Sequence, residues 1–385
     1  MTPRERTLAV IDGEELFPVP FDLIMNFIHP RPEGGLCRHF GLADGDHEGL
    51  LAALGAHTRW GKPAYIGPPL EPAPFSIPSS FPNKAATRSI WGGWVGVNTY
   101  TDQFIRPLRD AETVADVEAH TWPNPDWSDY GRIGWLEDSP QQYAPIGEWA
   151  AKRSQYLRIV GGFDPVFSRI MELCGMERGL LMLAANPPVI HALVAHIGEY
   201  MEQYYRRIAQ AGRGYPASSR GYIDVIAMGD DFAGQRGMLL HPDRWREYFL
   251  PLWKRLFTIP HQYGMKAQLH SCGAIRPVLG DLVDAGLDVF EVVQISATGM
   301  DPVELKREFG AHLTFYGTVD VQTVLPFGSA QEVRREVRRL IDVLARGGRF
   351  ILANSHIVQE DVPVANVLAM FDEARSYRPD WATRA

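Results

Sequence analysis

Residues 266–294 read KAQLHSCGAIRPVLGDLVDAGLDVFEVVQ, and this stretch decides the fold class. It opens with Lys266–His270, a short apolar run that predicts a strand. Apolar residues at three- and four-residue spacing then predict a helix, and Asp288–Val293 predicts a second strand. Because strand, helix and strand in this order form a βαβ unit, the stretch predicts a parallel sheet covered by helices.

The same alternation extends from about Tyr156 to the C-terminal region. The strands that it predicts are Tyr156–Val160, Asp224–Met228, Lys266–His270, Asp288–Val293, Leu313–Tyr316 and Arg349–Ala353. Helical patterns over 189–212 and 332–348 end in glycine, a residue that often follows the last turn of a helix. Proline at positions 242, 302 and 363 marks helix starts, since a first-turn N–H has no intrahelical partner.

The first 150 residues are less regular and are rich in proline, glycine and tryptophan. They predict a strand within 16–25, a helix over 47–57 and a hairpin over 89–104. Residues 121–131, TWPNPDWSDYG, predict an extended connection. We expect one domain over 1–385, in which 1–150 supply an irregular extension, the hairpin and lid-like loops over the active-site mouth.

The overall composition excludes several classes of protein. A net charge of -8 gives no basic surface for nucleic acid or an anionic membrane, so a small molecule or a protein is the expected partner. Three cysteines do not form a disulfide framework, and no apolar run is long enough for a signal peptide or a membrane span. These features predict a cytoplasmic protein; the oligomeric state stays open, a homodimer included.

His270 and Cys272 stand two residues apart at the end of a predicted strand. Side chains at this spacing leave the same face of a strand, and imidazole and thiolate both bind zinc well. The alternative is a core histidine beside a buried, inert thiol. Position favours the metal site, because catalytic residues of α/β barrels lie at the C-terminal ends of the strands. His356, just past the last predicted strand, is the candidate third ligand, and a solvated loop histidine is the alternative there.

Further polar residues follow the predicted strands. Glu291 is a candidate fourth metal ligand; the alternatives are a supporting hydrogen bond to His270 and a polar residue near the rim of the barrel without a role in the site. Asp230 and Asp231 are candidates for proton transfer or substrate orientation, with helix capping as the alternative. The other catalytic candidates are Tyr316 and Asp320, and the candidates for substrate binding are Gln235, Gln294 and Gln322.

Four spaced blocks carry a resemblance to a known family. They are GDDFAGQRGMLLHPDRWREYFLPLWKRL, LHSCGAIRPVL, YGTVDVQTVLPFGSAQEV and ILANSHIVQEDVPVANVLAMF. Together these blocks resemble the uroporphyrinogen decarboxylase superfamily. The resemblance implies a (β/α)8 TIM barrel with its active site at the C-terminal mouth, and an enzyme that is either a decarboxylase or a corrinoid-linked methyltransferase.

The two branches match this chain at different residues. The pair His270 and Cys272 resembles the zinc site of the methyltransferase branch, whose third ligand is a cysteine near the last strand; in this chain His356 takes that place. The decarboxylase branch also keeps a functional histidine at the position of His356. Its N-terminal R-Q-A-G-R segment, which would bind substrate carboxylates, has no match in this chain, although Arg31 and Arg38 are present.

The leading hypothesis is therefore a zinc-dependent methyltransferase of this superfamily. It would move a methyl group to or from a thiol, a folate such as tetrahydrofolate, or a small methylated substrate. The chain has no D-x-H-x-x-G motif, so the corrinoid (cobalamin) would be carried by a separate protein. The rival is a metal-independent decarboxylase of a small aromatic or pyrrolic acid, and a non-catalytic binding protein is a third reading.

Overall fold

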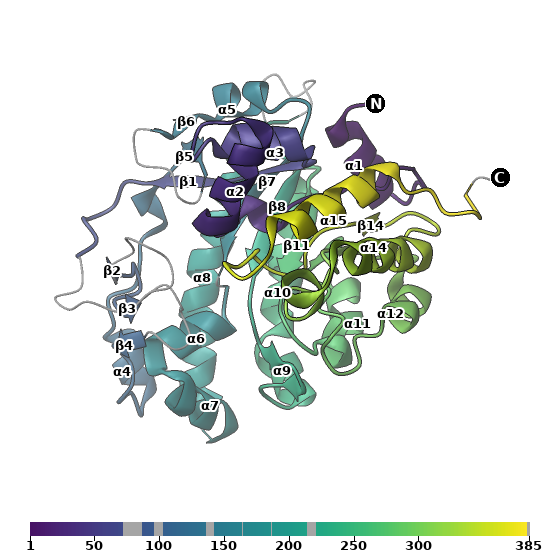
Figure 1. The fold of residues 1–385 in the computed structure, drawn as a ribbon. Coiled ribbons are helices and arrows are strands. Elements are labelled where there is room, and N and C mark those ends of the chain that lie inside the picture. The colour runs from purple at the N-terminus through teal and green to yellow at the C-terminus, as the bar shows by residue number, and fades with distance from the viewer. Residues whose placement is uncertain are drawn as a thin grey trace.

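A parallel sheet lies at the centre of the molecule (Figure 1). The computed structural model describes residues 1–71, 87–95, 103–135, 142–163, 165–185, 187–213 and 221–382. Seven strands pair in parallel, each with the next: β1 (Thr58–Tyr65), β7 (Leu157–Phe163), β8 (Val225–Gly229), β11 (Lys266–His270), β12 (Val289–Glu291), β13 (Thr314–Tyr316) and β14 (Phe350–Ile351). All six strands predicted between 156 and 353 are thus confirmed.

Residues 20–22 join the two edges of this parallel sheet. The Leu352 N–H donates to the Pro20 carbonyl and the Asp22 N–H donates to the Leu352 carbonyl, each at 2.9 Å. On the other side, the His57 N–H donates to the Phe21 carbonyl at 3.2 Å. The segment therefore lies between β14 and the start of β1 as an eighth strand. The predicted (β/α)8 barrel is confirmed, and the strand expected within 16–25 is its first.

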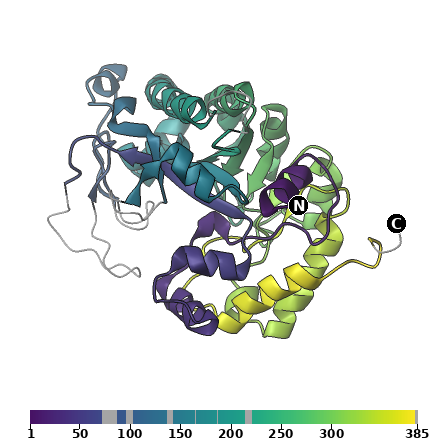
Figure 2. The same cartoon turned by 90° about the horizontal axis from the view of Figure 1, so that it is seen from above.

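Helices surround the barrel, as Figure 2 shows from above. Their bounds after β7 are α6 (Phe167–Cys174), α7 (Met176–Ala185), α8 (Pro187–Gly212), α9 (Pro242–Tyr248), α10 (Leu250–Gln262), α11 (Arg276–Asp284), α12 (Pro302–Phe309), α13 (Val324–Phe327), α14 (Ala330–Leu344) and α15 (Val364–Ser376). Pro242 and Pro302 begin helices as predicted, and Pro363 is the residue before α15. Helix α14 illustrates the packing, because its apolar residues at three- and four-residue spacing are fully buried against the barrel.

The N-terminal part is only partly as predicted. Its elements are α1 (Pro3–Ile11), the 3-10 turn η1 (Ile24–Asn26), α2 (Pro30–Phe40), α3 (His47–Leu54), β2 (Thr87–Arg88), β3 (Trp94–Val95), β4 (Gln103–Ile105), α4 (Val114–Glu118), η2 (Pro125–Trp127), β5 (Ser128–Gly134), β6 (Ala144–Pro145) and α5 (Ile146–Lys152). The predicted hairpin forms between β3 and β4, although residues 96–102 lie outside the described part. The predicted connection at 121–131 contains the start of β5, which pairs antiparallel with β1.

Long apolar helices raise the question of membrane insertion. Within the described ranges no single helix is long and apolar enough to cross a membrane, and the bent pair of α7 and α8 meets the test of length and composition only jointly.

A buried carboxylate lies where the first strand meets β1. Asp22 is 1% exposed and accepts hydrogen bonds from the hydroxyls of Thr58 and Tyr316. Burial raises the pKa of Asp22 to about 6, although the two hydroxyls partly oppose that effect. The folded chain therefore holds a proton on this carboxyl more tightly than the unfolded chain, so its contribution to stability is present at low pH and is lost as the pH rises.

Substitution of Asp22 makes this pH dependence measurable. Between pH 4 and pH 7, the free energy of unfolding of the wild type should fall by about 2–3 kcal/mol relative to that of Asp22→Asn, which cannot ionise. Urea unfolding of both proteins at the two pH values measures the difference. If the difference in unfolding free energy between the two proteins does not change with pH, the Asp22 carboxyl has the same pKa in the folded and the unfolded chain.

Candidate metal centre

His270 and Cys272 lie at the C-terminal end of β11, with their ligand atoms turned toward each other. The Cys272 Sγ is 3.6 Å from His270 Nε2. The His270 side chain is buried, whereas Cys272 is partly exposed. This is the arrangement that the two-residue spacing predicts, because alternate side chains of a strand leave the same face.

His356 joins these two residues from the loop after β14. The rings of His270 and His356 are 6.0 Å apart between centroids and meet edge to face. One ligand atom from each of His270, Cys272 and His356 fits within 4.8 Å of the other two. His356 is thus not a histidine turned away into solvent, and the three side chains form a cluster of two imidazoles and one thiol.

The loop that carries His356 is fixed by backbone contacts to the end of β13. The Ser355 N–H donates to the Val319 carbonyl at 2.7 Å, and the Asn354 side chain donates to the His356 carbonyl at 2.5 Å. Asn354 is completely buried. These contacts hold the loop against its neighbouring strand and place the imidazole over the barrel mouth.

Glu291 supports His270 rather than joining the three-residue cluster. Its Oε1 is 3.3 Å from His270 Nδ1, on the side of the ring opposite to Cys272, and its Oε2 accepts a hydrogen bond from Gln268. Glu291 is fully buried at the end of β12, directly beside His270 in the sheet. A carboxylate at Nδ1 fixes the ring orientation and leaves Nε2 as the ligand atom. The supporting role that the sequence left open is the one that this geometry favours.

Burial and neighbouring charges shift the pKa values of the cluster. Burial opposes the charge on His270, but Cys272 and Glu291 outweigh it and raise the pKa of His270 well above its usual value. Burial lowers the pKa of His356 to about 4, with a smaller effect from His270. Burial also raises the pKa of the Cys272 thiol, and the Asp231 carboxylate adds to this effect. At neutral pH His356 is therefore an uncharged imidazole, the form that binds metals.

Asp231 and Gln294 shape the turn that follows Cys272. The Cys272 N–H donates to Asp231 Oδ1 at 2.7 Å, and the Gly273 N–H donates to Gln294 Oε1 at 2.8 Å. Gly273 has a φ of +87°, and a Cβ there would lie 2.7 Å from the Gly234 carbonyl oxygen. Only glycine fits this turn without strain. Both polar residues therefore contact the turn of Cys272 and Gly273 through its backbone.

Two predicted catalytic aspartates lie at helix N-termini. Asp230 accepts from the Phe167 and Ser168 N–H groups at 2.9 and 2.8 Å, at the start of α6. Burial raises its pKa to about 6, which the hydrogen bonds oppose. Asp320 accepts from the Thr323 N–H at 2.8 Å, just before α13. These contacts favour the capping role that was the alternative for Asp230, and they give Asp320 the same role.

The remaining predicted residues lie in different surroundings. Tyr316 is completely buried and donates to Asp22, in the same layer of the barrel as Glu291. Gln235 and Gln322 are exposed, and the backbone carbonyl of Gln235 accepts from the Thr298 N–H at 2.9 Å. Their role in substrate binding stays a prediction.

Sequence reasoning missed Asp22, Gln268 and Asn354. The signal for Asp22 was a lone carboxylate inside an apolar strand pattern, VPFDLIM, and the signal for Asn354 was its place two residues before His356. Gln268 faces the same side of β11 as His270, because it lies two residues before it. In each case the residue type was visible but its partner, on a distant strand, was not.

The support from Glu291 leads to a testable expectation. Glu291→Gln should weaken zinc affinity about 10- to 100-fold without abolishing binding, since the ring of His270 loses a charged partner and keeps a hydrogen-bonding one. Competition with a chelator of known affinity measures this change. Glu304→Gln, which removes an exposed partner of Arg276, is the control and should leave the zinc affinity unchanged. Complete loss of metal in Glu291→Gln would instead make Glu291 a direct ligand.

Comparison with known proteins agrees with this geometry. The family model for uroporphyrinogen decarboxylase (URO-D) matches residues 157–377, more than half of the chain. The methylcobamide:CoM methyltransferase MtaA of Methanosarcina barkeri is 26% identical over 147 residues, which are 38% of this chain and 40% of that protein. The chain thus matches well under two thirds of the length of this relative.

A solved structure extends the similarity to the whole fold. A methyltransferase from Methanosarcina mazei superimposes with a TM-score of 0.63 at 18% identity, over 97% of this chain and 98% of the other. At that identity the match shows the barrel fold. Both of these proteins are named as methyltransferases. The family match, the barrel and its mouth residues together lead to one conclusion: this chain belongs to the uroporphyrinogen decarboxylase (URO-D) family.

Proposed function

We propose that this protein is a zinc-dependent methyltransferase that exchanges a methyl group with a corrinoid carried by a separate protein. The observation that carries the proposal is the cluster of His270, Cys272 and His356, whose ligand atoms lie within 4.8 Å of one another. Cys272 and His356 are partly exposed, so a reacting molecule can reach the cluster.

The distances fit a zinc ion. Bond lengths of about 2.3 Å to sulfur and 2.0–2.1 Å to nitrogen place a sulfur and a nitrogen ligand about 3.6 Å apart at a tetrahedral angle. The Cys272 Sγ and His270 Nε2 are 3.6 Å apart. Three protein ligands with one position left open is the usual composition of a catalytic zinc site.

Zinc would supply thiol activation, since a thiol bound to it is held as thiolate near neutral pH. The residues of the chain prepare the site for this chemistry. Glu291 orients His270, and Asp231 holds the backbone of Cys272. Burial keeps His356 uncharged, with its pKa at about 4. The site thus offers two imidazole nitrogens and one sulfur in a fixed arrangement.

The methyl donor, and with it the partner protein, is proposed from the similar methyltransferase. The relative from Methanosarcina barkeri is named for methylcobamide, and we assign the same class of donor, a methylated corrinoid, to this chain. The acceptor belongs to one of three classes: a thiol, a folate or the parent of a small methylated compound. All three cysteines are free, and a reducing compartment such as the cytoplasm would keep Cys272 competent to bind metal.

An assay of methyl transfer from methylcobalamin to a thiol tests the proposal. The absorbance of the corrinoid reports the loss of its methyl group. Wild type should be active, and removal of the metal or substitution by His270→Ala or Cys272→Ala should abolish transfer. His356→Ala should lower it by at least about tenfold, since one of three ligands is lost. Activity toward a carboxylic acid that survives metal removal and the first two substitutions, but not His356→Ala, would instead support the decarboxylase.

A further inference from the structure

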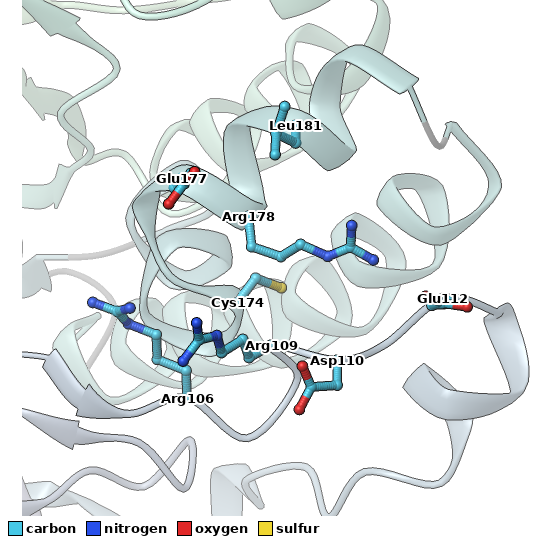
Figure 3. A pocket seen from close by; sticks show the side chains of 8 residues that line it. All are labelled: Arg106, Arg109, Asp110, Glu112, Cys174, Glu177, Arg178 and Leu181. Atoms are coloured by element: carbon cyan, nitrogen blue, oxygen red, sulfur yellow. The ribbon is translucent and has the colours of Figure 1, made fainter.

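A pocket lies away from the metal centre, between the turn at 106–112 and the corner where α6 meets α7 (Figure 3). Its volume is about 370 Å³, within the range of small-ligand pockets. The described lining residues are Arg106, Arg109, Asp110, Glu112, Cys174, Glu177, Arg178 and Leu181. Nothing in the chemistry of the metal centre uses these residues.

Three arginines line this pocket, and in the described ranges none of them has a carboxylate partner. Within the described part of the chain, Arg106, Arg109 and Arg178 form no ion pair, although carboxylates also line the pocket. The Arg106 Nε is shielded from solvent and has no hydrogen-bond partner among the described residues. Arg246 on α9, by contrast, pairs with both Asp243 and Asp281. The pocket therefore concentrates guanidinium groups that have no paired carboxylate in the part of the chain that the structure describes.

The arginines are held in place by the backbone around them. The Leu108 N–H donates to the Leu173 carbonyl at 2.9 Å, which ties the turn to the end of α6. Arg178 donates to the Ala111 carbonyl at 3.1 Å, which ties the same turn to α7. Gly175, with a φ of +86°, leaves room for Arg106, since a Cβ there would lie 2.6 Å from the Arg106 Cδ. The guanidinium groups are thus arranged before any ligand binds.

Charges are unevenly distributed across the pocket. Figure 3 shows Arg106 and Arg109 side by side. The guanidinium of Arg178 and the carboxylates of Asp110 and Glu112 lie on the other side of Cys174, and Glu177 on α7 is the one labelled carboxylate on the side of Arg106 and Arg109. Burial raises the pKa of Cys174 to about 12, so this thiol is uncharged and does not repel an anion. The side formed by Arg106 and Arg109 is the one suited to an anion, because a guanidinium offers paired donors that match a carboxylate or a phosphate.

We propose that this pocket binds a small molecule through an oxyanion group, a phosphate or a carboxylate, held by Arg106 and Arg109. The site is distinct from the metal centre. Helix α6 separates the two, from Phe167 near Asp230 to Cys174 at the pocket, and eight residues of helix span about 12 Å. Binding of the anion should therefore not depend on the metal or on the proposed methyl transfer.

Calorimetric titration at low ionic strength tests the proposal, with inorganic phosphate and citrate as separate probes. Wild type should bind at least one of them, and the probe that binds identifies the class of oxyanion. The double variant Arg106→Gln/Arg109→Gln should bind about tenfold or more weakly, because charge-assisted hydrogen bonds are lost. Arg244→Gln, which removes an arginine paired with Glu247 on α9, is the matched control and should bind like wild type.

The metal-site variant Cys272→Ser separates this proposal from the proposed function. It should bind the probe as tightly as wild type even if methyl transfer is lost. Absence of binding to both probes in wild type would overturn the proposal. So would equal affinity in wild type and the double variant, with circular dichroism showing both proteins folded.

Discussion

Cys272→Ser should lose most of its bound zinc, from about one ion per chain to below about a tenth, because a thiolate is a far better zinc ligand than a hydroxyl. The barrel should stay folded, since Cys272 is partly exposed and lies after the strand, outside the largest buried cluster. Metal analysis of protein purified without added zinc measures the effect. Cys37→Ala, at a buried cysteine of the core far from the site in the sequence, is the control and should keep its metal. Equal metal content in wild type and Cys272→Ser would contradict the assignment.

Asp224→Ala should lower the free energy of unfolding by about 3–5 kcal/mol, because it leaves two buried guanidinium groups without a counter-charge. Asp224 lies just before β8, at the end of the barrel opposite to the mouth. Its Oδ1 is 2.6 Å from Arg4 Nη2, and its Oδ2 is 3.1 Å from Arg158 Nε. Arg4 and Arg158 are 9% and 4% exposed, so water can replace little of this interaction.

An exposed ion pair provides the control for Asp224. Asp281→Ala removes one of the two carboxylate partners of Arg246, whose side chain is 38% exposed, and should change the free energy of unfolding by no more than about 1 kcal/mol. Urea unfolding of wild type and both variants compares them directly. Losses of similar size in Asp224→Ala and Asp281→Ala would show that the buried pair is worth no more than a surface pair.

The barrel strands were predictable where apolar runs alternate with helical patterns, but β1 was not. Its sequence, TRWGKPAY, contains a buried arginine, a glycine and a proline, which are uncommon in a central strand. The structure accommodates Arg59 through Glu48, at 2.6 Å from its Nε, and Gly61 against Ile133. Those partners lie on α3 and β5, and no pattern within β1 reveals them.

At the candidate site, the positions of residues relative to the strands predicted which side chains meet, whereas residue type alone did not predict their roles. The pair His270 and Cys272 could be read from the strand period, and the position of His356 after the last strand brought it to the same mouth. The roles of Asp230 and Glu291 could not be chosen from sequence, because a carboxylate after a strand can bind a metal, cap a helix or support a histidine. Their partners, the N-terminus of α6 and His270 Nδ1, decide between these roles and become known only when the chain is folded.

X-ray absorption at the zinc edge, on protein purified without added metal, tests the central claim most directly. Binding by His270, Cys272 and His356 predicts about one zinc ion per chain, with one sulfur at about 2.3 Å and two imidazole nitrogens at about 2.0–2.1 Å. The sulfur contribution should be absent from any metal retained by Cys272→Ser. A wild-type protein without bound metal, or one whose zinc has only nitrogen and oxygen neighbours, would contradict the account.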